Sequence, residues 1–289
     1  DCVKVNHNNF IIYGSDNREI QKSLIAKKCN FNFTTHTQSC AAVCIERFAY
    51  MDIDECNFVN CWNSQFAGYA IAIRYGLNGQ DGKDNCKFVL TNSLFQNCNN
   101  DHANNADGRV IQGYGNLQST FTNCTIRDTV KGRYIFKWDH ISGSNVTQFE
   151  LSQFKFINNI ADCLEGGGAG IYINRAQNIV FSNCIFNGNS FDNSTAVIGG
   201  GAVGKSYDFT NLKSVLYDGC TFEDNKAANQ NGGSLFISSP KHSTTVEGCK
   251  FINTLNVNDP GIAKLGGAIY IDADNKGGVS IKGCQFDNL

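Results

Sequence analysis

The sequence predicts an all-β protein, a parallel β-helix solenoid of about nine three-stranded rungs. The first observation is a pattern, apolar-x-apolar-x-x-Cys-x-Phe, that returns nine times along the chain. The second observation is the type of residue found at the two variable positions before the Cys of this pattern, here called the gap. The third is a glycine-rich apolar segment that follows most copies. A repeat sustained along a whole chain indicates a solenoid, in which each unit packs on its neighbours.

Each copy of the pattern predicts two short strands joined by a tight bend. Apolar residues alternate with polar ones in each half, as in a strand with one buried face, and the gap shifts this phase by one residue. The second gap residue is Lys28, Glu55, Asn92, Asn123, Gln153, Asn183, Gly219, Gly248 or Gly283. Six of these nine are Asn or Gly, which tolerate a left-handed backbone, so we expect the bend at this position.

The last position of the pattern predicts an internal ladder of aromatic rings. It is filled by Phe31, Phe58, Phe95, Phe156, Phe186, Phe222, Phe251 and Phe286, and by Ile126 in the fourth copy. Equivalent residues of successive rungs in a parallel β-helix stack about 4.8 Å apart. We therefore expect these side chains to form one column inside the solenoid.

A third strand is expected after each pair, beyond a loop of variable length. It is clearest in the glycine-led segments 167–173, 200–203, 232–237 and 266–271, and weaker versions lie at 41–45, 68–73, 108–112 and 134–138. Three strands and three corners describe one triangular rung. Successive copies are 27 to 37 residues apart, longer than a bare rung, so we expect polar loops to leave the rungs.

We expect a single domain over residues 1–289, with an N-terminal partial rung at 1–20 and repeated rungs at 21–289. The chain carries 24 Lys and Arg against 26 Asp and Glu, scattered along its length, for a net charge of −2. This balance argues against nucleic-acid partners, and the lack of a long apolar run argues against membrane insertion. The first residues resemble neither a signal peptide nor an initiating Met, so we expect a mature chain or an excised segment.

The chain has 14 cysteines, and seven of them stand two residues before the ladder Phe: Cys29, Cys56, Cys124, Cys184, Cys220, Cys249 and Cys284. Rung spacing allows disulfides between neighbours such as Cys29 with Cys56 and Cys249 with Cys284, and a ladder of free thiols is an equal alternative. Cys61 and Cys98 follow the ladder Phe by three residues, where later copies have Asn159, Asn189 and Asn225. We predict a disulfide between Cys61 and Cys98. The partners of Cys2, Cys40, Cys44, Cys86 and Cys163 stay open.

Four N-glycosylation sequons begin at Asn32, Asn123, Asn145 and Asn193, each near a bend or a loop. Chance alone produces several such triplets in a chain rich in Asn. Together with the many cysteines, they favour a secreted or cell-surface glycoprotein.

The later copies resemble a known repeat family. Phe-x-x-Asn at 156–159, 186–189 and 222–225, interleaved with Gly-Gly-Ala-Ile at 266–269 and its variants, is similar to the repeat of polymorphic outer-membrane proteins. The resemblance extends from about residue 149 to the end and is weak before residue 99. It implies a right-handed parallel β-helix and a role in surface display, adhesion or structure, without catalytic residues. The cysteines and sequons suit a secreted eukaryotic, protist-like version.

Parallel β-helices also include polysaccharide lyases and hydrolases, which place carboxylates, or carboxylates with Arg or Lys, on successive rungs. The nearest match is Lys137-Trp138-Asp139-His140, which is loosely similar to a pectate lyase signature but lacks its spacer residue. Asp52 and Asp54 should share the solvent face of one strand, where solvation is the more common role. The five histidines have no metal-binding spacing, and we predict no catalytic residues, no metal and no cofactor.

Three functions follow from this reading. The first is a non-enzymatic extracellular rod whose uncapped end stacks on another copy, for which residues 6–13 would supply the first partial rung. The second is a surface adhesin or carbohydrate-binding module that uses Tyr, Trp62 or Trp138 on an outer face. The third is a polysaccharide lyase or hydrolase centred near Asp139 and His140. The expected partners are other copies of the chain, and possible ligands are glycans or other surface proteins.

Overall fold

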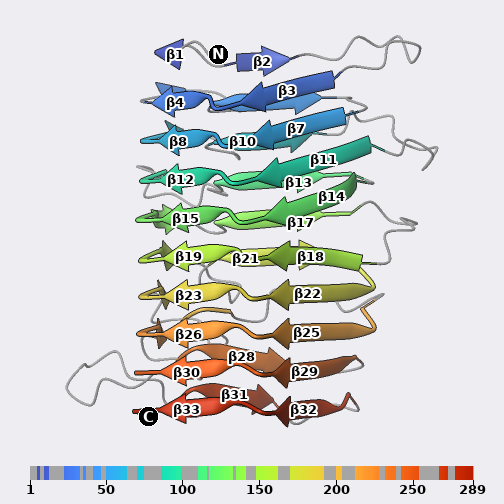
Figure 1. Ribbon diagram of the computed structural model, residues 1–289, viewed down its shortest axis with the longest axis vertical. Coiled ribbons are helices and arrows are strands. Elements are labelled where there is room, and N and C mark those ends of the chain that lie inside the picture. Colours follow the sequence, from blue (N-terminus) through green and yellow to red (C-terminus); the bar gives the residue numbers. More distant parts are fainter. Residues whose placement is uncertain are drawn as a thin grey trace.

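The computed structural model describes residues 5–6, 10–12, 23–32, 35–36, 42–46, 50–63, 70–74, 86–98, 110–115, 117–132, 135–140, 148–161, 170–191, 200–203, 212–227, 232–238, 242–253, 267–272 and 277–288. In these residues all regular structure is β-strand, and every strand pair is parallel. In Figure 1 the chain descends from the N-terminal to the C-terminal end, the front strands run to the left and the strands behind them run to the right. This sense of winding is right-handed, so the predicted right-handed parallel β-helix is confirmed.

Two sheets lie at the front of Figure 1 and contain the two strands of the repeated pattern. The first sheet consists of β3 (Ser23–Lys27), β7 (Tyr50–Asp54), β11 (Cys86–Thr91), β14 (Leu117–Thr122), β18 (Gln148–Ser152), β22 (Asn178–Ser182), β25 (Ser214–Asp218), β29 (Ser243–Glu247) and β32 (Val279–Lys282). The second sheet consists of β1 (Val5–Asn6), β4 (Asn30–Asn32), β8 (Asn57–Val59), β12 (Leu94–Gln96), β15 (Thr125–Arg127), β19 (Lys155–Ile157), β23 (Ile185–Asn187), β26 (Thr221–Glu223), β30 (Lys250–Ile252) and β33 (Gln285–Asp287).

The third sheet lies behind and contains the predicted third strands. It consists of β2 (Phe10–Ile12), β6 (Val43–Glu46), β10 (Ile71–Arg74), β13 (Ile111–Tyr114), β17 (Phe136–Asp139) and β21 (Ile171–Asn174). A separate pair, β28 (Leu235–Ser238) and β31 (Ile269–Asp272), continues it, and Val203 forms an isolated bridge to Leu235. Every predicted third-strand segment therefore includes residues that pair with a neighbouring rung, either in a parallel strand or, at Val203, in a single bridge.

Six short strands after the second corner were not predicted from the sequence. They are β16 (Val130–Gly132), β20 (Ile160–Ala161), β24 (Ser190–Phe191) and β27 (Lys226–Ala227) in one sheet, and β5 (Thr35–His36) and β9 (Trp62–Asn63) in another. Most are only two residues long, which is too short for an alternating pattern to be recognised.

The first corner of each rung is a left-handed residue at the predicted position. All nine second-gap residues have φ between 50° and 60°, including the unfavourable Lys28, Glu55 and Gln153. A second series of left-handed residues, absent from our prediction, stands two residues after the ladder position: Asn60, Asn97, Asp128, Asn158, Gly188, Asp224, Asn253 and Asn288. Asn, Asp and Gly tolerate this conformation best, so the signal was present in the sequence.

The predicted Phe ladder is confirmed as a column of in-register side chains. Phe31, Phe58 and Phe95 stack with ring centroids 4.6 and 4.7 Å apart. Ile126 then interrupts the column of rings. The second stack contains Phe156, Phe186, Phe222, Phe251 and Phe286, with centroids 4.8 to 5.3 Å apart and ring planes within 8°.

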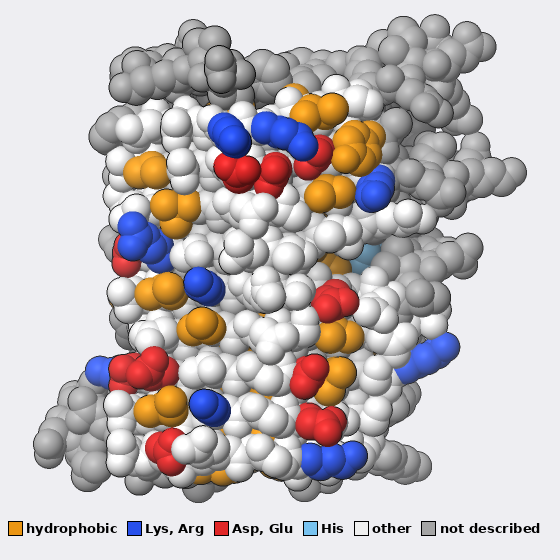
Figure 2. Space-filling view, viewed as in Figure 1, with side chains coloured by type: hydrophobic (Ala, Val, Ile, Leu, Met, Phe, Trp, Pro, Cys, Tyr) orange, Lys and Arg blue, Asp and Glu red, His pale blue; other side chains and the backbone are white. Residues whose placement is uncertain are grey.

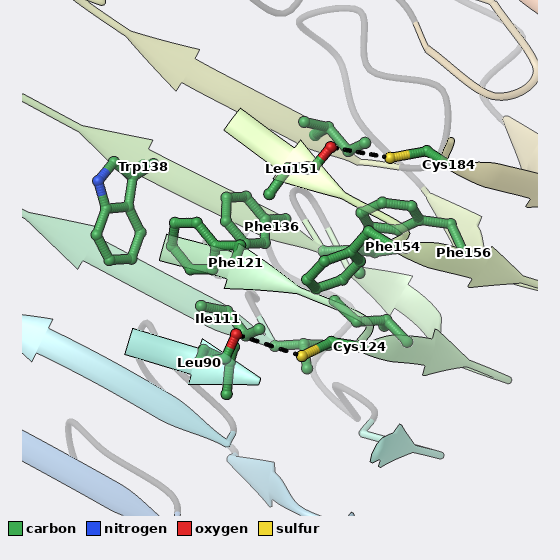
Figure 3. Packing of buried hydrophobic residues seen from close by; sticks show 14 of the residues in the cluster. Leu90, Ile111, Phe121, Cys124, Phe136, Trp138, Leu151, Phe154, Phe156 and Cys184 are labelled. Atoms are coloured by element: carbon green, nitrogen blue, oxygen red, sulfur yellow. Dashed lines mark hydrogen bonds between the residues drawn. The ribbon is translucent and has the colours of Figure 1, made fainter. Parts of the chain in front are cut away.

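An aromatic cluster fills the middle of the core, where Phe121 and Phe136 lie near Trp138 and Phe154 packs against Phe136 (Figure 3). All four side chains are fully buried. Gly113 of β13 lies in register with Trp138 of β17, and a Cβ atom at Gly113 would overlap the indole ring. The glycine therefore provides the space that the large side chain of the next rung occupies.

Candidate functional site

A ladder of three buried asparagines follows the Phe column at the second corner. The side-chain amide of Asn159 donates to Oδ1 of Asn189 at 3.0 Å, and that of Asn189 donates to Oδ1 of Asn225 at 3.1 Å. Each amide also donates to a backbone carbonyl of the preceding rung, at 2.8 to 3.0 Å. Each Oδ1 accepts a backbone N–H of the preceding rung as well, at 3.1 Å. This column satisfies buried polar groups and is structural.

The predicted disulfide between Cys61 and Cys98 is wrong, because both residues keep their thiols. They occupy the asparagine column in earlier rungs, and each thiol points at the carbonyl of the preceding ladder residue, Phe31 or Phe58. The sulfur atoms thus take the place of the asparagine amide. Burial, followed by the hydrogen bond with Cys61, raises the pKa of the Cys98 thiol well above its ordinary value.

The column two residues before the ladder Phe is also built from thiols. Cys56, Cys124, Cys184, Cys220, Cys249 and Cys284 are not oxidised, so the pairs Cys29–Cys56 and Cys249–Cys284 are wrong and the alternative thiol ladder is correct for these six. Cys29 is disulfide-bonded, but to none of them. Figure 3 shows Cys124 and Cys184 donating to the carbonyls of Leu90 and Leu151 in the preceding rungs, at 3.7 and 3.2 Å. Burial raises the pKa of Cys124 to about 12, which suppresses the reactive thiolate.

The asparagines of two of the four sequons lie within the described residues. Asn123 stands exposed at a first corner, where its side-chain amide donates to Oδ1 of Asn92 at 2.8 Å. Asn32 ends β4 and is partly buried, with its Oδ1 shielded from solvent and without a hydrogen-bond partner. Asn145 and Asn193 lie outside the described residues.

Asp139 and His140, the centre of the enzyme hypothesis, face opposite sides of the third sheet. Asp139 lies 3.3 Å from the Lys137 ammonium and accepts from the side-chain amide of Asn174 at 3.0 Å. His140 is fully buried against Phe149, and neither ring nitrogen has a hydrogen-bond partner. Burial lowers the pKa of His140 to about 4, so its ring is neutral near pH 7. The two side chains do not form an acid-base pair.

The placement of Trp138 on an outer face is also wrong, because its side chain is fully buried in the aromatic cluster. Trp62 lies in β9, but its side chain is outside what the structure describes. The exposed aromatic on the outer face of the third sheet is Tyr114, which is 41% exposed. The adhesin hypothesis proposes outer-face tyrosines as a class of ligand-binding residues. Tyr114 could not be singled out, because the exposure of a side chain cannot be predicted from a short strand alone.

Asp52 and Asp54 lie on the outer face of β7, as the alternation predicted. Asp52 pairs with Lys27 at 3.4 Å, and Asp54 accepts from the Thr91 hydroxyl at 2.7 Å. The hydrogen bonds from Thr91 and Asn92 lower the pKa of Asp54. Figure 2 shows acidic and basic side chains mixed on this face of the molecule, without a broad patch of one sign. These carboxylates are therefore part of a solvated, paired surface.

The last described rung carries interior-type side chains that are not covered. Phe286 and Ile281 are 42% exposed and Ile271 is 39% exposed, whereas Phe251 and Val246 in the preceding rung are fully buried. Within the described strands, β31, β32 and β33 each pair with one neighbour, on the side of the preceding rung. At the other end of the described chain, β1 and β2 pair with β4 and β6 and belong to one partial rung.

The described part of the chain contains neither a gathering of three or more potential metal ligands nor a helix able to cross a membrane. No family model, no curated protein and no solved structure matches the chain. The similarity of its repeats to polymorphic outer-membrane proteins stays a prediction.

Proposed function

We propose that this protein is a non-enzymatic extracellular structural protein, a glycosylated β-helical rod that stacks end to end into a filament, sheath or cell-surface appendage. The observation that carries this proposal is the stack of equivalent parallel rungs, in which the sheets and the Phe column continue from one rung to the next through the described residues. A parallel stack of this kind can be extended when the strand edges of another copy pair with it.

The Phe column supports a head-to-tail arrangement of the copies. Val5 of β1 lies in register with Phe31, and Phe286 of β33 lies in register with Phe251, so β1 and β33 stand at opposite ends of one described sheet. Pairing β33 of one copy with β1 of another would continue this sheet through the joint. A heterologous contact of this kind produces open filaments rather than closed dimers.

The cysteines support an oxidising compartment. Cys29 is disulfide-bonded, which is a bond that persists mainly in secreted and surface proteins. The thiols of the core survive such conditions because burial keeps them protonated and away from oxidants. The exposed sequon at Asn123 is compatible with glycosylation in the same compartment.

Light scattering over a concentration series and electron microscopy of the full chain test the proposal. We expect concentration-dependent linear particles, and substitution of Phe286→Asp or Ile281→Lys to weaken the end contact by at least about tenfold, because an exposed apolar anchor is lost. The matched control is Leu216→Lys, a partly exposed outward residue of β25. Monodisperse monomers at all concentrations, or equal assembly of the end variants and the control, would contradict the proposal.

A further inference from the structure

The outer face of the third sheet carries a compact group of polar and aromatic side chains that the rod function does not use. The group, here called the third-sheet patch, consists of Gln112, Tyr114, Lys137, Asp139, Tyr172 and Asn174. We propose that the third-sheet patch binds a neutral glycan, with the sugar face against Tyr114 and the hydroxyl groups on its polar neighbours.

Strand register places the six residues in a regular array. Gln112, Lys137 and Tyr172 are in-register partners on β13, β17 and β21, and they form one column across three rungs. Tyr114, Asp139 and Asn174 form the second column, two residues further along the same strands. Alternate residues of a strand point to one face, so the two columns share the outer surface. Such a rigid array holds binding groups at fixed spacing.

Tyr114 provides the flat apolar surface on which a sugar ring stacks. Its side chain is 41% exposed, and among the described side chains the only other exposed aromatic is Phe286 on the last rung. A tyrosine offers a broad apolar ring with a polar tip at little entropic cost, which suits a ligand with one apolar face and many hydroxyl groups.

The polar members of the patch provide one hydrogen-bond acceptor that a ligand can reach. The Asp139 carboxylate is held by Lys137 and Asn174 and is 13% exposed, so a sugar hydroxyl group can donate to it. Gln112 Oε1 and Asn174 Oδ1 have no hydrogen-bond partner but are shut off from solvent, so a ligand reaches them only after their side-chain amides turn outward. A carboxylate acceptor beside an exposed ring favours a ligand rich in donors.

The charge of the patch favours a neutral ligand over an acidic one. The Lys137 ammonium lies 3.3 Å from the Asp139 carboxylate and 5.2 Å from the centre of the Tyr172 ring. The neighbouring Arg175 donates to the carbonyl oxygen of His140 at 3.2 Å. The positive charges therefore already have partners, and little is left to attract a carboxylated or sulfated sugar.

Saturation-transfer NMR and calorimetric titration of the full chain test this inference. The probes are neutral oligosaccharides of the gluco, manno, xylo and N-acetylglucosamine series, with oligogalacturonate as the acidic comparison. Tyr114→Ala is expected to weaken binding of the recognised neutral probe about tenfold through loss of the stacking surface. Asn174→Ala tests the acceptor group independently, and Tyr50→Ala, on the outer face of β7, is the matched aromatic control.

Binding of a neutral probe that Tyr114→Ala and Asn174→Ala both weaken, while Tyr50→Ala does not, would support the inference. It would be overturned by absence of binding to every neutral probe, by preference for oligogalacturonate, or by equal loss in the Tyr50→Ala control. The titration reports on the third sheet and light scattering reports on the ends. The glycan site and the end-to-end rod can therefore fail separately.

Discussion

Asn189 is the central member of the asparagine ladder, and its side chain makes contacts with two neighbouring rungs. Its Oδ1 accepts from the backbone and side-chain amides of Asn159, and its own amide donates to the carbonyl of Phe156 in the same preceding rung and to Oδ1 of Asn225 in the following rung. Asn189→Ala leaves these groups buried without partners, so we expect the free energy of unfolding to fall by about 3 kcal/mol. Urea denaturation followed by circular dichroism measures this loss.

The cysteines of the same column suggest a graded comparison for this site. Asn189→Cys restores a donor toward Phe156, as Cys98 does toward Phe58, but supplies a poor acceptor for Asn159. We expect it to cost less than Asn189→Ala. Asn178→Ala, on the outer face of β22, is the control: it loses a partly exposed hydrogen bond from Ser214 and should change stability by no more than about 1 kcal/mol. Equal effects of Asn189→Ala and the control would contradict a structural role for the ladder.

His140 predicts a specific dependence of stability on pH. Its pKa is lowered from 6.5 to about 4 in the folded chain, mainly by burial. The unfolded chain therefore binds this proton first as the pH falls, and stability is lost between pH 6.5 and 4, with no further loss from this group below pH 4. The full loss amounts to about 3 kcal/mol.

Unfolding free energies of the wild type and His140→Phe, measured from pH 7.5 to 4, test this prediction. The variant places an apolar ring among apolar neighbours, so the difference between the two proteins should grow in favour of the variant as the pH falls. His242 also has a lowered pKa because of burial, and its contribution is common to both proteins. Parallel pH profiles would show that His140 does not titrate in this way.

At the scale of the strand and corner, the first bend was predictable and the second was not recognised. The first bend interrupts an alternating pattern, so both the phase shift and the residue type at Asn92 or Gly248 signal it. The second bend follows strands of only three residues, such as β8 and β12, where no pattern precedes it. Its only signal is Asn, Asp or Gly two residues after the ladder position, as at Asn97.

The candidate sites were less predictable than the fold, for a reason of geometry. Alternation correctly separates inward from outward residues, which located the Phe ladder and the acidic face of β7. It does not say whether two stacked cysteines form a disulfide or bond to carbonyl groups, as Cys61 and Cys98 do. It also does not give the exposure of an outward residue such as Tyr114, which depends on segments distant in sequence.

Across the whole molecule, a solenoid restricts packing interactions to neighbouring rungs. The inward column of the third sheet runs through Ile73, Gly113, Trp138 and Ile173, so one glycine and one tryptophan share the space of two medium-sized residues. Trp138→Val alone should create a cavity and cost about 3 to 5 kcal/mol of unfolding free energy. Gly113→Val alone should also destabilise, because its side chain would overlap the indole ring.

The double variant Gly113→Val with Trp138→Val should recover much of this loss, because two valines refill the shared space as Ile73 and Ile173 do in the adjacent rungs. Urea denaturation of the four proteins gives the coupling energy, which we expect to be about 2 kcal/mol or more. Gly113→Val combined with Phe222→Leu, on a distant rung, is the control and should be additive within about 0.5 kcal/mol. If the two valines are additive, Gly113 and Trp138 do not share one packing space. If the distant pair couples as strongly, packing in this rod is not confined to adjacent rungs.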